Sequence, residues 1–167
     1  MGKIINKEEI KKIIENLKNN NKKTVFTNGC FDVLHVGHTR YLKASKQYGD
    51  ILVIGLNSDN SVKKIKGNSR PINSEFDRAE ILSELNFVDY VVIFDEASPS
   101  QLIDEIKPDI YTKGADYTME TLPEAFVVKK NNIKVHFINF IEGKSTTSII
   151  NKINNGRCGK IQKMTIF

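Results

Sequence analysis

The sequence predicts an α/β protein built on a doubly wound, five-stranded parallel sheet. Three observations lead to this prediction. Short apolar runs alternate along the chain with segments of helical periodicity. Residues 51–56 are continuously apolar, which is typical of a strand that is buried on both faces of a parallel sheet. Polar or glycine-containing segments follow the strands, at the edge where open α/β sheets bind their ligands.

The predicted elements follow one another in the order that such a sheet requires. Residues 4–20 place isoleucine and leucine at helical spacing and predict an amphipathic helix. Strands are expected at residues 23–28, 51–56, 88–94, 109–113 and 133–140. Helices are expected at residues 35–48, 74–85, 98–106 and 121–131, with another beginning near residue 145, and a basic loop is expected at residues 61–71.

Composition indicates one soluble domain. With 167 residues, we expect an N-terminal helix at 1–21 packed on a domain at 22–153, and a tail at 154–167. The net charge of +5 suits an anionic substrate, but no basic run is interleaved with aromatics, so we expect no nucleic-acid partner. No segment resembles a membrane span or a signal peptide, and the two cysteines are far apart. We therefore expect a cytoplasmic protein with free thiols and no membrane partner.

Residues 24–48 hold the sharpest motif in the chain. A short strand leads through Gly29 into a segment that places His35 and His38 in the first turn of a helix. Unpaired backbone N–H groups and the helix dipole favour an anion there, and Gly37 allows a ligand to approach the backbone. The stretch thus suits a polyphosphate. A metal site and two ordinary surface histidines are the alternatives.

Two further stretches fit a phosphate ligand. The basic residues of 61–71 follow a sheet strand, and they are either a flexible phosphate clamp or a solvated charge cluster. Ser145, Thr146 and Thr147 follow Gly143 at the start of the last helix. One hydroxyl there would serve as an ordinary N-cap, but three in a row exceed what capping requires.

Residues 29–38, GCFDVLHVGH, resemble the GxFDxxHxGH signature of the cytidylyltransferase-like nucleotidyltransferases, and residues 142–147 resemble their ExxSTT-type C-terminal signature. The resemblance covers residues 22–153 and implies a Rossmann-like nucleotidyltransferase fold. Within this superfamily the chain is most similar to the D-glycero-β-D-manno-heptose 1-phosphate adenylyltransferases, which occur alone or fused to a sugar kinase. Residues carrying that closer likeness are 25–32, 55–59, 70–71, 77–80, 88–94, 113–117 and 142–147.

The resemblance implies an enzyme that transfers AMP from ATP to a sugar 1-phosphate, giving ADP-heptose for the lipopolysaccharide core and releasing pyrophosphate. That family often has a second glycine where this chain has Ala115. Glycerol-3-phosphate cytidylyltransferases carry arginines where this chain has Asn86 and Phe140, so their likeness is weaker. The rival hypotheses are a cytidylyltransferase for glycerol 3-phosphate or another alcohol phosphate, and a non-catalytic nucleotide-binding module.

The motifs and the resemblance together assign the site. Mg²⁺ is expected to be bridged by the triphosphate, with no protein side chain assigned as its ligand. We expect a stand-alone homodimer with the sugar phosphorylated elsewhere. The catalytic assignments are His35, His38, Lys66, Arg78 and Thr146, and Arg78 is expected to donate hydrogen bonds to pyrophosphate oxygens. The nucleotide-binding assignments are Thr27, Asn28, Gly29, Cys30, Phe31, Gly37, Asn57, Asp59, Lys64, Lys113, Gly114, Asp116, Gly143, Ser145 and Thr147.

Overall fold

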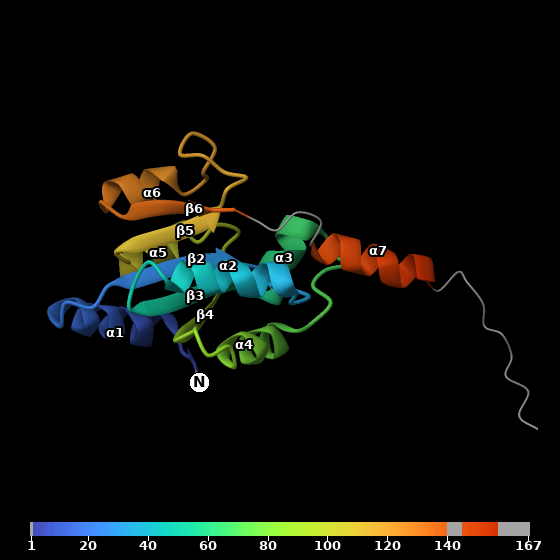
Figure 1. Ribbon diagram of the computed structural model, residues 1–167, viewed down its shortest axis with the longest axis horizontal. Helices are drawn as coiled ribbons and strands as arrows, with labels where there is room; N and C mark the ends of the chain where they lie inside the picture. The colour runs from blue at the N-terminus through green and yellow to red at the C-terminus, as the bar shows by residue number, and fades with distance from the viewer. Residues whose placement is uncertain (1, 140–144, 157–167) are drawn as a thin grey trace, which may run out of the picture.

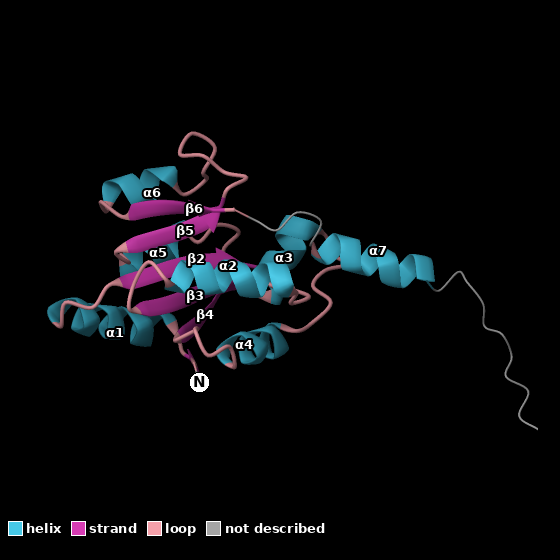
Figure 2. Cartoon of the chain, in the orientation of Figure 1, coloured by secondary structure: helices cyan, strands magenta, loops and turns pink. Residues whose placement is uncertain are grey.

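The computed structural model describes residues 2–139 and 145–156 and confirms the α/β class with a parallel sheet. Its strands lie in the order β1-β4-β3-β2-β5-β6 (Figures 1 and 2). They are β1 (Lys3–Ile4), β2 (Thr24–Gly29), β3 (Ile51–Asn57), β4 (Tyr90–Phe94), β5 (Ile110–Gly114) and β6 (Lys134–Ile138). The helices are α1 (Lys7–Asn19), α2 (Val36–Lys46), α3 (Asp59–Lys66), α4 (Glu75–Ser83), α5 (Ser100–Ile106), α6 (Ala125–Lys130) and α7 (Thr146–Gly156).

Helices cover both faces of the sheet, and this explains the apolar runs of the sequence. Phe26 and Val53 face a core formed with α1, α5 and α6, whereas their neighbours Val25, Leu52 and Ile54 face a core formed with α2 and α4. Successive strand residues point to opposite faces, so burial on both sides requires a hydrophobic residue at nearly every position.

The prediction of five strands was one short. The additional strand, β1, pairs with Tyr90 and Val91 at the edge of the sheet and is only two residues long, too short to produce a recognisable pattern. The predicted helix at 4–20 consequently begins later, at Lys7. Asn6 and Glu9 form a capping box there, in which each side chain accepts a hydrogen bond from the other's backbone N–H.

The expected basic loop at 61–71 is largely helical. The Ser58 side chain accepts a hydrogen bond from Ser61 N and starts α3, which ends at Gly67 with φ of 90°. A positive φ favours glycine, so the chain leaves the helix there. The lysines of this stretch are therefore on a helix, and the irregular segment begins only at Gly67. The helix expected at 121–131 is likewise shorter, at Ala125–Lys130.

The strand order creates a point where ligands commonly bind. From β2 the chain proceeds to β3 and β4 on one side, then crosses to β5 and β6 on the other. The carboxyl ends of β2 and β5 consequently flank a topological switch point. The helices α3 and α7 lie at this end of the sheet, and α7 extends away from it (Figure 1).

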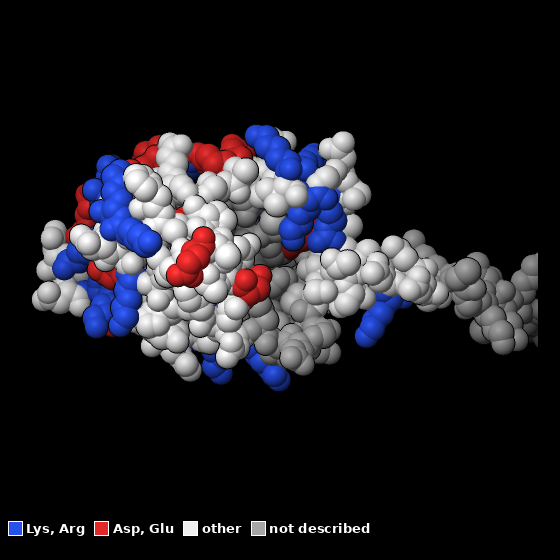
Figure 3. Space-filling model, turned by 90° about the horizontal axis from the view of Figure 1, so that it is seen from above, with Lys and Arg blue, Asp and Glu red and all other residues white. Residues whose placement is uncertain are grey.

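Surface charge is distributed in small groups. Lys and Arg side chains form separate groups on the face in Figure 3, with Asp and Glu side chains between them. Within the described residues, no helix is long and apolar enough to cross a membrane.

Candidate active site

A cavity of about 160 Å³ lies at the switch point. It is bounded by the end of β2 and the turn after it, the first turn of α2, the last residue of α3, the end of β5 and the start of α7. Its lining consists of Asn28, Gly29, Cys30, Phe31, Asp32, His38, Tyr41, Lys66, Lys113, Gly114, Asp116, Tyr117 and Thr146. The fold thus brings together most of the nucleotide-binding residues expected from the first motif and from residues 113–116.

The two motif histidines form a stacked pair at the start of α2. Their ring centroids are 3.8 Å apart, and His38 also meets the Phe31 ring edge-on at 5.3 Å. His35 is the N-cap, and its Nδ1 accepts a hydrogen bond from Gly37 N at 3.1 Å. His35 therefore contacts His38 but is not in the cavity lining, although it was assigned as catalytic, whereas His38 lines the cavity.

His38 is poised to bind a ligand. Its Nδ1 is buried and has no hydrogen-bond partner in the part of the chain that is described. Burial lowers the pKa of His38 to about 4, with smaller contributions from the positive charges of His35 and Lys66. Because buried polar atoms are rarely left unpaired, this unpaired nitrogen on a ring that lines the cavity indicates a site for a polar ligand.

The turn after β2 requires a glycine because it packs tightly. A Cβ on Gly29 would lie 2.9 Å from Cε2 of Phe31, a distance that side chains essentially never reach. Phe31 has a φ of 44°, in the left-handed region. The absence of a side chain at Gly29 thus allows the Phe31 ring, which lines the cavity, to pack against the end of β2.

Asp32 organises the irregular segment after α3, although the motif reading assigned it no role. Its buried carboxylate accepts hydrogen bonds from Ile72 N at 2.6 Å and Asn73 N at 3.1 Å, and forms an ion pair with Arg70 Nε at 2.7 Å. Lys66, immediately before this segment, lies in the cavity lining. The carboxylate therefore tethers the segment to the first motif.

Arg78 is not in the lining, contrary to the expected contact with pyrophosphate. The side chain is 1% exposed, and it donates hydrogen bonds to the carbonyl oxygens of Asn73, Cys30 and Asn57 and to Oδ1 of Asp59. This geometry gives no support to a direct phosphate contact. Arg78 instead connects α4 to the end of β3 and to the turn after β2. Sequence reasoning missed this because it cannot reveal which way a helical arginine points.

The structure describes the second motif from Ser145 onward, so Gly143 lies outside the described residues. Ser145 Oγ accepts a hydrogen bond from Ser148 N and caps α7. Thr146 is 9% exposed, lines the cavity and donates a hydrogen bond from Oγ1 to Val33 O at 3.4 Å. Thr147 faces an adjoining cavity that also reaches Lys66.

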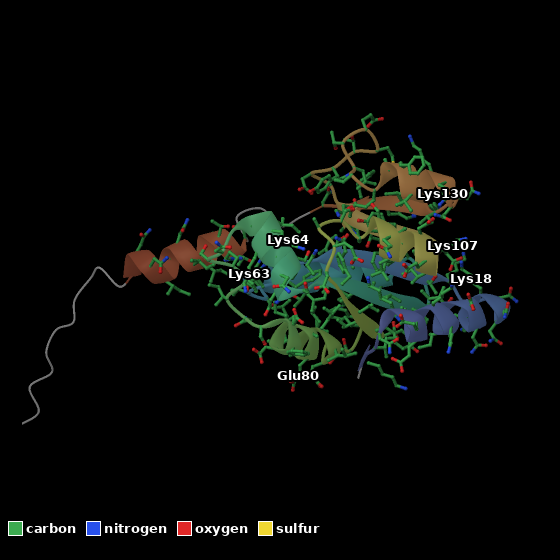
Figure 4. The ribbon with its side chains drawn as sticks, turned by 180° about the vertical axis from the view of Figure 1, so that it is seen from behind. Lys18, Lys63, Lys64, Glu80, Lys107 and Lys130 are labelled. Carbon is green, nitrogen blue, oxygen red and sulfur yellow. The ribbon has the colours of Figure 1, made fainter. Side chains whose placement is uncertain are left out.

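Several other assigned residues lie outside the lining. Thr27 is fully buried and its Oγ1 is 2.8 Å from Tyr41 Oη. Gly37 is buried within α2. Lys64 is exposed on α3, beside Lys63 at the end of the molecule near α7 and far from Lys18, Lys107 and Lys130 (Figure 4). Asn57 and Asp59 are partners of Arg78.

Two tyrosines in the lining were not assigned from the motifs. Tyr41 is on α2, one turn after His38, a spacing that also fits simple core packing. Tyr117 follows the end of β5, and Lys113 Nζ lies 5.4 Å from its ring centroid. The polar segment after β5 was the one sequence feature that placed Tyr117 near the site. A sequence does not show whether such a tyrosine stacks on a ligand or packs against the protein.

The donor set suits a metal ion that is held mainly by a ligand. Within the described ranges, no three His, Cys, Asp or Glu side chains gather as a metal-binding group. Of the two carboxylates in the lining, Asp32 is committed to Arg70 and to backbone N–H groups, whereas Asp116 is exposed. Mg²⁺ commonly keeps few protein ligands and binds substrate phosphates, so this set is compatible with a triphosphate-bound ion.

Comparison with known proteins agrees with this geometry. The profile of the family described as Cytidylyltransferase-like matches residues 26–152. The chain is 53% identical over 150 residues to the Bifunctional protein HldE of Campylobacter concisus, covering 90% of this chain and 30% of that protein. It is 52% identical over 152 residues to the Bifunctional protein HldE of Geobacter metallireducens, covering 91% and 31%. The chain thus spans less than a third of the length of these curated relatives.

A solved structure is similar over almost its whole length. It is the lipopolysaccharide core biosynthesis protein from Thermoplasma volcanium, with a TM-score of 0.59 and 35% identity over 74% of this chain and 99% of that one. The family profile covers both the histidine pair and the start of α7. With its parallel sheet, its switch-point cavity and its GCFDVLHVGH motif, this chain belongs to the cytidylyltransferase-like family.

Proposed function

We propose that this protein is a nucleotidyltransferase that transfers AMP from ATP to a sugar 1-phosphate, D-glycero-β-D-manno-heptose 1-phosphate, and releases pyrophosphate. The observation that carries the proposal is the stacked histidine pair, in which His38 lines the switch-point cavity and has a buried Nδ1 without a partner among the described residues. The similarity to HldE proteins and to a lipopolysaccharide core biosynthesis protein supports the choice of substrates.

The reaction needs alignment and charge stabilisation more than proton transfer. An oxygen of the sugar phosphate forms a bond to the α-phosphorus of ATP while the bond to the bridging oxygen of pyrophosphate breaks. The attacking phosphate is already ionised, so no general base is required. Negative charge gathers on the α-phosphate and on the leaving group, and preorganised donors stabilise it.

His38 donates an N–H bond to the phosphates in this proposal, and His35 holds it in place. In the ligand-free protein both imidazoles have a lowered pKa, chiefly because of burial. The negative charge of bound phosphates acts in the opposite direction and favours the protonated ring. Substrate binding therefore strengthens the donor at the position where charge develops.

Lys66 and the start of α7 complete the phosphate site from the other side. Lys66 neutralises phosphate charge at the cavity mouth, and Thr146 adds a hydroxyl beside the N-terminus of α7. Ser145 and Thr147 flank it, with Thr147 in the adjoining cavity. A bound divalent ion, which we propose is Mg²⁺, supplies further neutralisation of the triphosphate.

We assign Arg78 and Asp32 positioning roles in place of direct substrate contact. Arg78 holds the backbone of Cys30, and Asp32 holds the segment that follows Lys66. Both side chains are almost fully buried, so their effect on the reaction passes through the residues that they hold.

A substrate panel tests the function directly. Purified protein would be given ATP or CTP with heptose 1-phosphate, glycerol 3-phosphate or ethanolamine phosphate, and pyrophosphate release and product mass would be measured. We expect ADP-heptose with ATP and a kcat/KM at least tenfold lower with CTP. Equal values, or a preference for CTP and an alcohol phosphate, would place the protein with the cytidylyltransferases. Nucleotide binding without turnover of any acceptor would indicate a binding module.

We also propose that the enzyme acts in the cytoplasm as a homodimer. Ile72, Phe76 and Ile81 lie on or beside α4 and are between 44% and 73% exposed, which is a candidate surface for a second copy. Light scattering of the wild type against Phe76→Glu measures this directly, because a charged side chain on the interface would shift a dimer towards the monomer.

A further inference from the structure

A buried charge pair lies beneath the cavity and is not used by the reaction as described above. Glu124 is 3% exposed, and its Oε2 is 3.4 Å from Nζ of Lys113, whose side chain is 13% exposed. Glu124 precedes α6, whereas Lys113 is near the end of β5. Carboxylates are rarely buried unless they are paired with a positive charge, and Lys113 is the positive charge that pairs with Glu124.

Lys113 directs its remaining hydrogen bonds towards β2. Its Nζ donates to Oδ1 of Asn28 at 3.1 Å and to Oη of Tyr111 at 2.9 Å. Tyr111 Oη in turn donates to the same Asn28 Oδ1 at 2.7 Å. The three groups form a closed triangle in which the amide oxygen of Asn28 accepts two hydrogen bonds.

This triangle fixes which end of the Asn28 amide meets the cavity. An asparagine carries its acceptor oxygen and its two N–H donors on opposite sides of one planar group. Because the oxygen faces Lys113 and Tyr111, the donors face away from them. Asn28 lines the cavity, and its Nδ2 makes no hydrogen bond to any described residue. Two amide N–H groups are thereby presented to whatever occupies the cavity.

We infer that Glu124 is a positioning residue that holds Lys113 as an ammonium ion and, through it, orients the Asn28 amide as a hydrogen-bond donor to the nucleotide. The inference rests on the proposed function for the identity of the ligand. A neutral Lys113 has a lone pair that can accept a hydrogen bond. It can therefore pair with the N–H groups of an Asn28 amide that has flipped. The oxygen of the flipped amide would then face the phosphates or the base. Glu124 thus prevents Asn28 from turning its acceptor oxygen towards a bound anion.

The protonation state of Lys113 depends on its neighbours. Burial lowers the pKa of Lys113, whereas the negative charge of Glu124 raises it. Replacing Glu124 by a neutral residue therefore lowers the pKa of Lys113 further. The other titratable groups near the lysine Nζ or in the cavity lining are Asp116, Cys30, Tyr111, Tyr117, Tyr41, Asp32, His38 and Lys66.

The test compares Glu124→Gln with Glu124→Asp, which keeps the charge, and with Glu120→Gln, a control at an exposed glutamate in the same segment. Nucleotide affinity would be measured by calorimetry without acceptor from pH 7 to 9, together with KM and kcat. We expect Glu124→Gln to raise the Kd and the KM for ATP about tenfold, and this increase should grow as the pH rises. The reduction in kcat should be smaller than the change in Kd and KM. Glu124→Asp should recover at least part of the affinity, and Glu120→Gln should match the wild type.

A double-mutant cycle with Asn28→Ala separates positioning from simple loss of structure. If Glu124 acts through Asn28, Glu124→Gln has little further effect on nucleotide affinity in the Asn28→Ala background. Additive losses in the cycle would overturn the inference, as would a pH-independent loss in folded Glu124→Gln. Absence of nucleotide binding by the wild type would instead refute the proposed function.

Discussion

Replacement of His38 by alanine is the most direct test of the site. His38 is the cavity-lining member of the stacked histidine pair, and its Nδ1 has no partner in the described part of the chain. Removal of one preorganised donor to a developing negative charge typically lowers turnover by about 10²- to 10³-fold, or roughly 2.7–4 kcal/mol. We expect a loss in this range, seen in kcat more than in the KM for ATP, because the bond strengthens in the transition state.

The fold should tolerate this change. His38→Ala removes the ring contacts with His35 and Phe31, which is destabilising, but it also removes a buried polar atom that has no hydrogen bond. Because these terms oppose each other, we expect the free energy of unfolding to stay within about 1 kcal/mol of the wild-type value. Urea unfolding followed by circular dichroism measures it.

The activity assay is continuous pyrophosphate release at saturating ATP and sugar phosphate. His136→Ala is a matched control, because His136, in β6, stacks on Tyr48 and lies outside the cavity lining. The control should retain wild-type kinetics. If folded His38→Ala also turned over at the wild-type rate, the assignment of the phosphate site to the α2 N-terminus would be wrong.

Three further predictions concern stability and motion. The pKa of His38 is about 4 in the folded protein against 6.5 as the ordinary value, so the unfolded chain binds a proton in this window and the folded chain does not. The free energy of unfolding should be highest above about pH 6.5 and fall by about 2–3 kcal/mol at pH 4.5 on account of this group, a loss that urea titrations should find missing in His38→Ala. Gly55→Ala should destabilise by about 1–3 kcal/mol, because its Cβ would lie 2.6 Å from Cζ of Phe26; unchanged urea midpoints would contradict this packing. Residues 63–71 should gain protection from hydrogen exchange when ATP and Mg²⁺ bind, and unchanged exchange at saturation would refute closure of this segment over the triphosphate.

The sequence alone determined the layered architecture. The continuous apolar run of 51–56 predicted a strand buried on both faces, and the structure covers β3 on one face with α1 and α5 and on the other with α2 and α4. A local signal such as Ser74 before α4 acts over a few residues, so it can be recognised without knowing the fold. The helix α3 was missed, because its residues were expected to be part of a basic loop. The two-residue strand β1 carries no such signal, since only its partner Tyr90–Phe94 defines it as a strand.

The sequence also predicted where the candidate site lies, because the histidine pair and the glycine turn are within one short segment, and His38 and Gly29 line the cavity. Only the tertiary structure decided which side chains face the cavity. The sequence predicted a phosphate contact for Arg78. In the structure its side chain is buried and donates to four protein acceptors, which are three carbonyl oxygens and the Asp59 carboxylate. Glu124 belongs to no motif, and its proposed role depends on Lys113 and Asn28, which lie on the paired parallel strands β5 and β2. Hydrogen bonds between residues so far apart in the chain are set by strand order and side-chain direction, which no local pattern records.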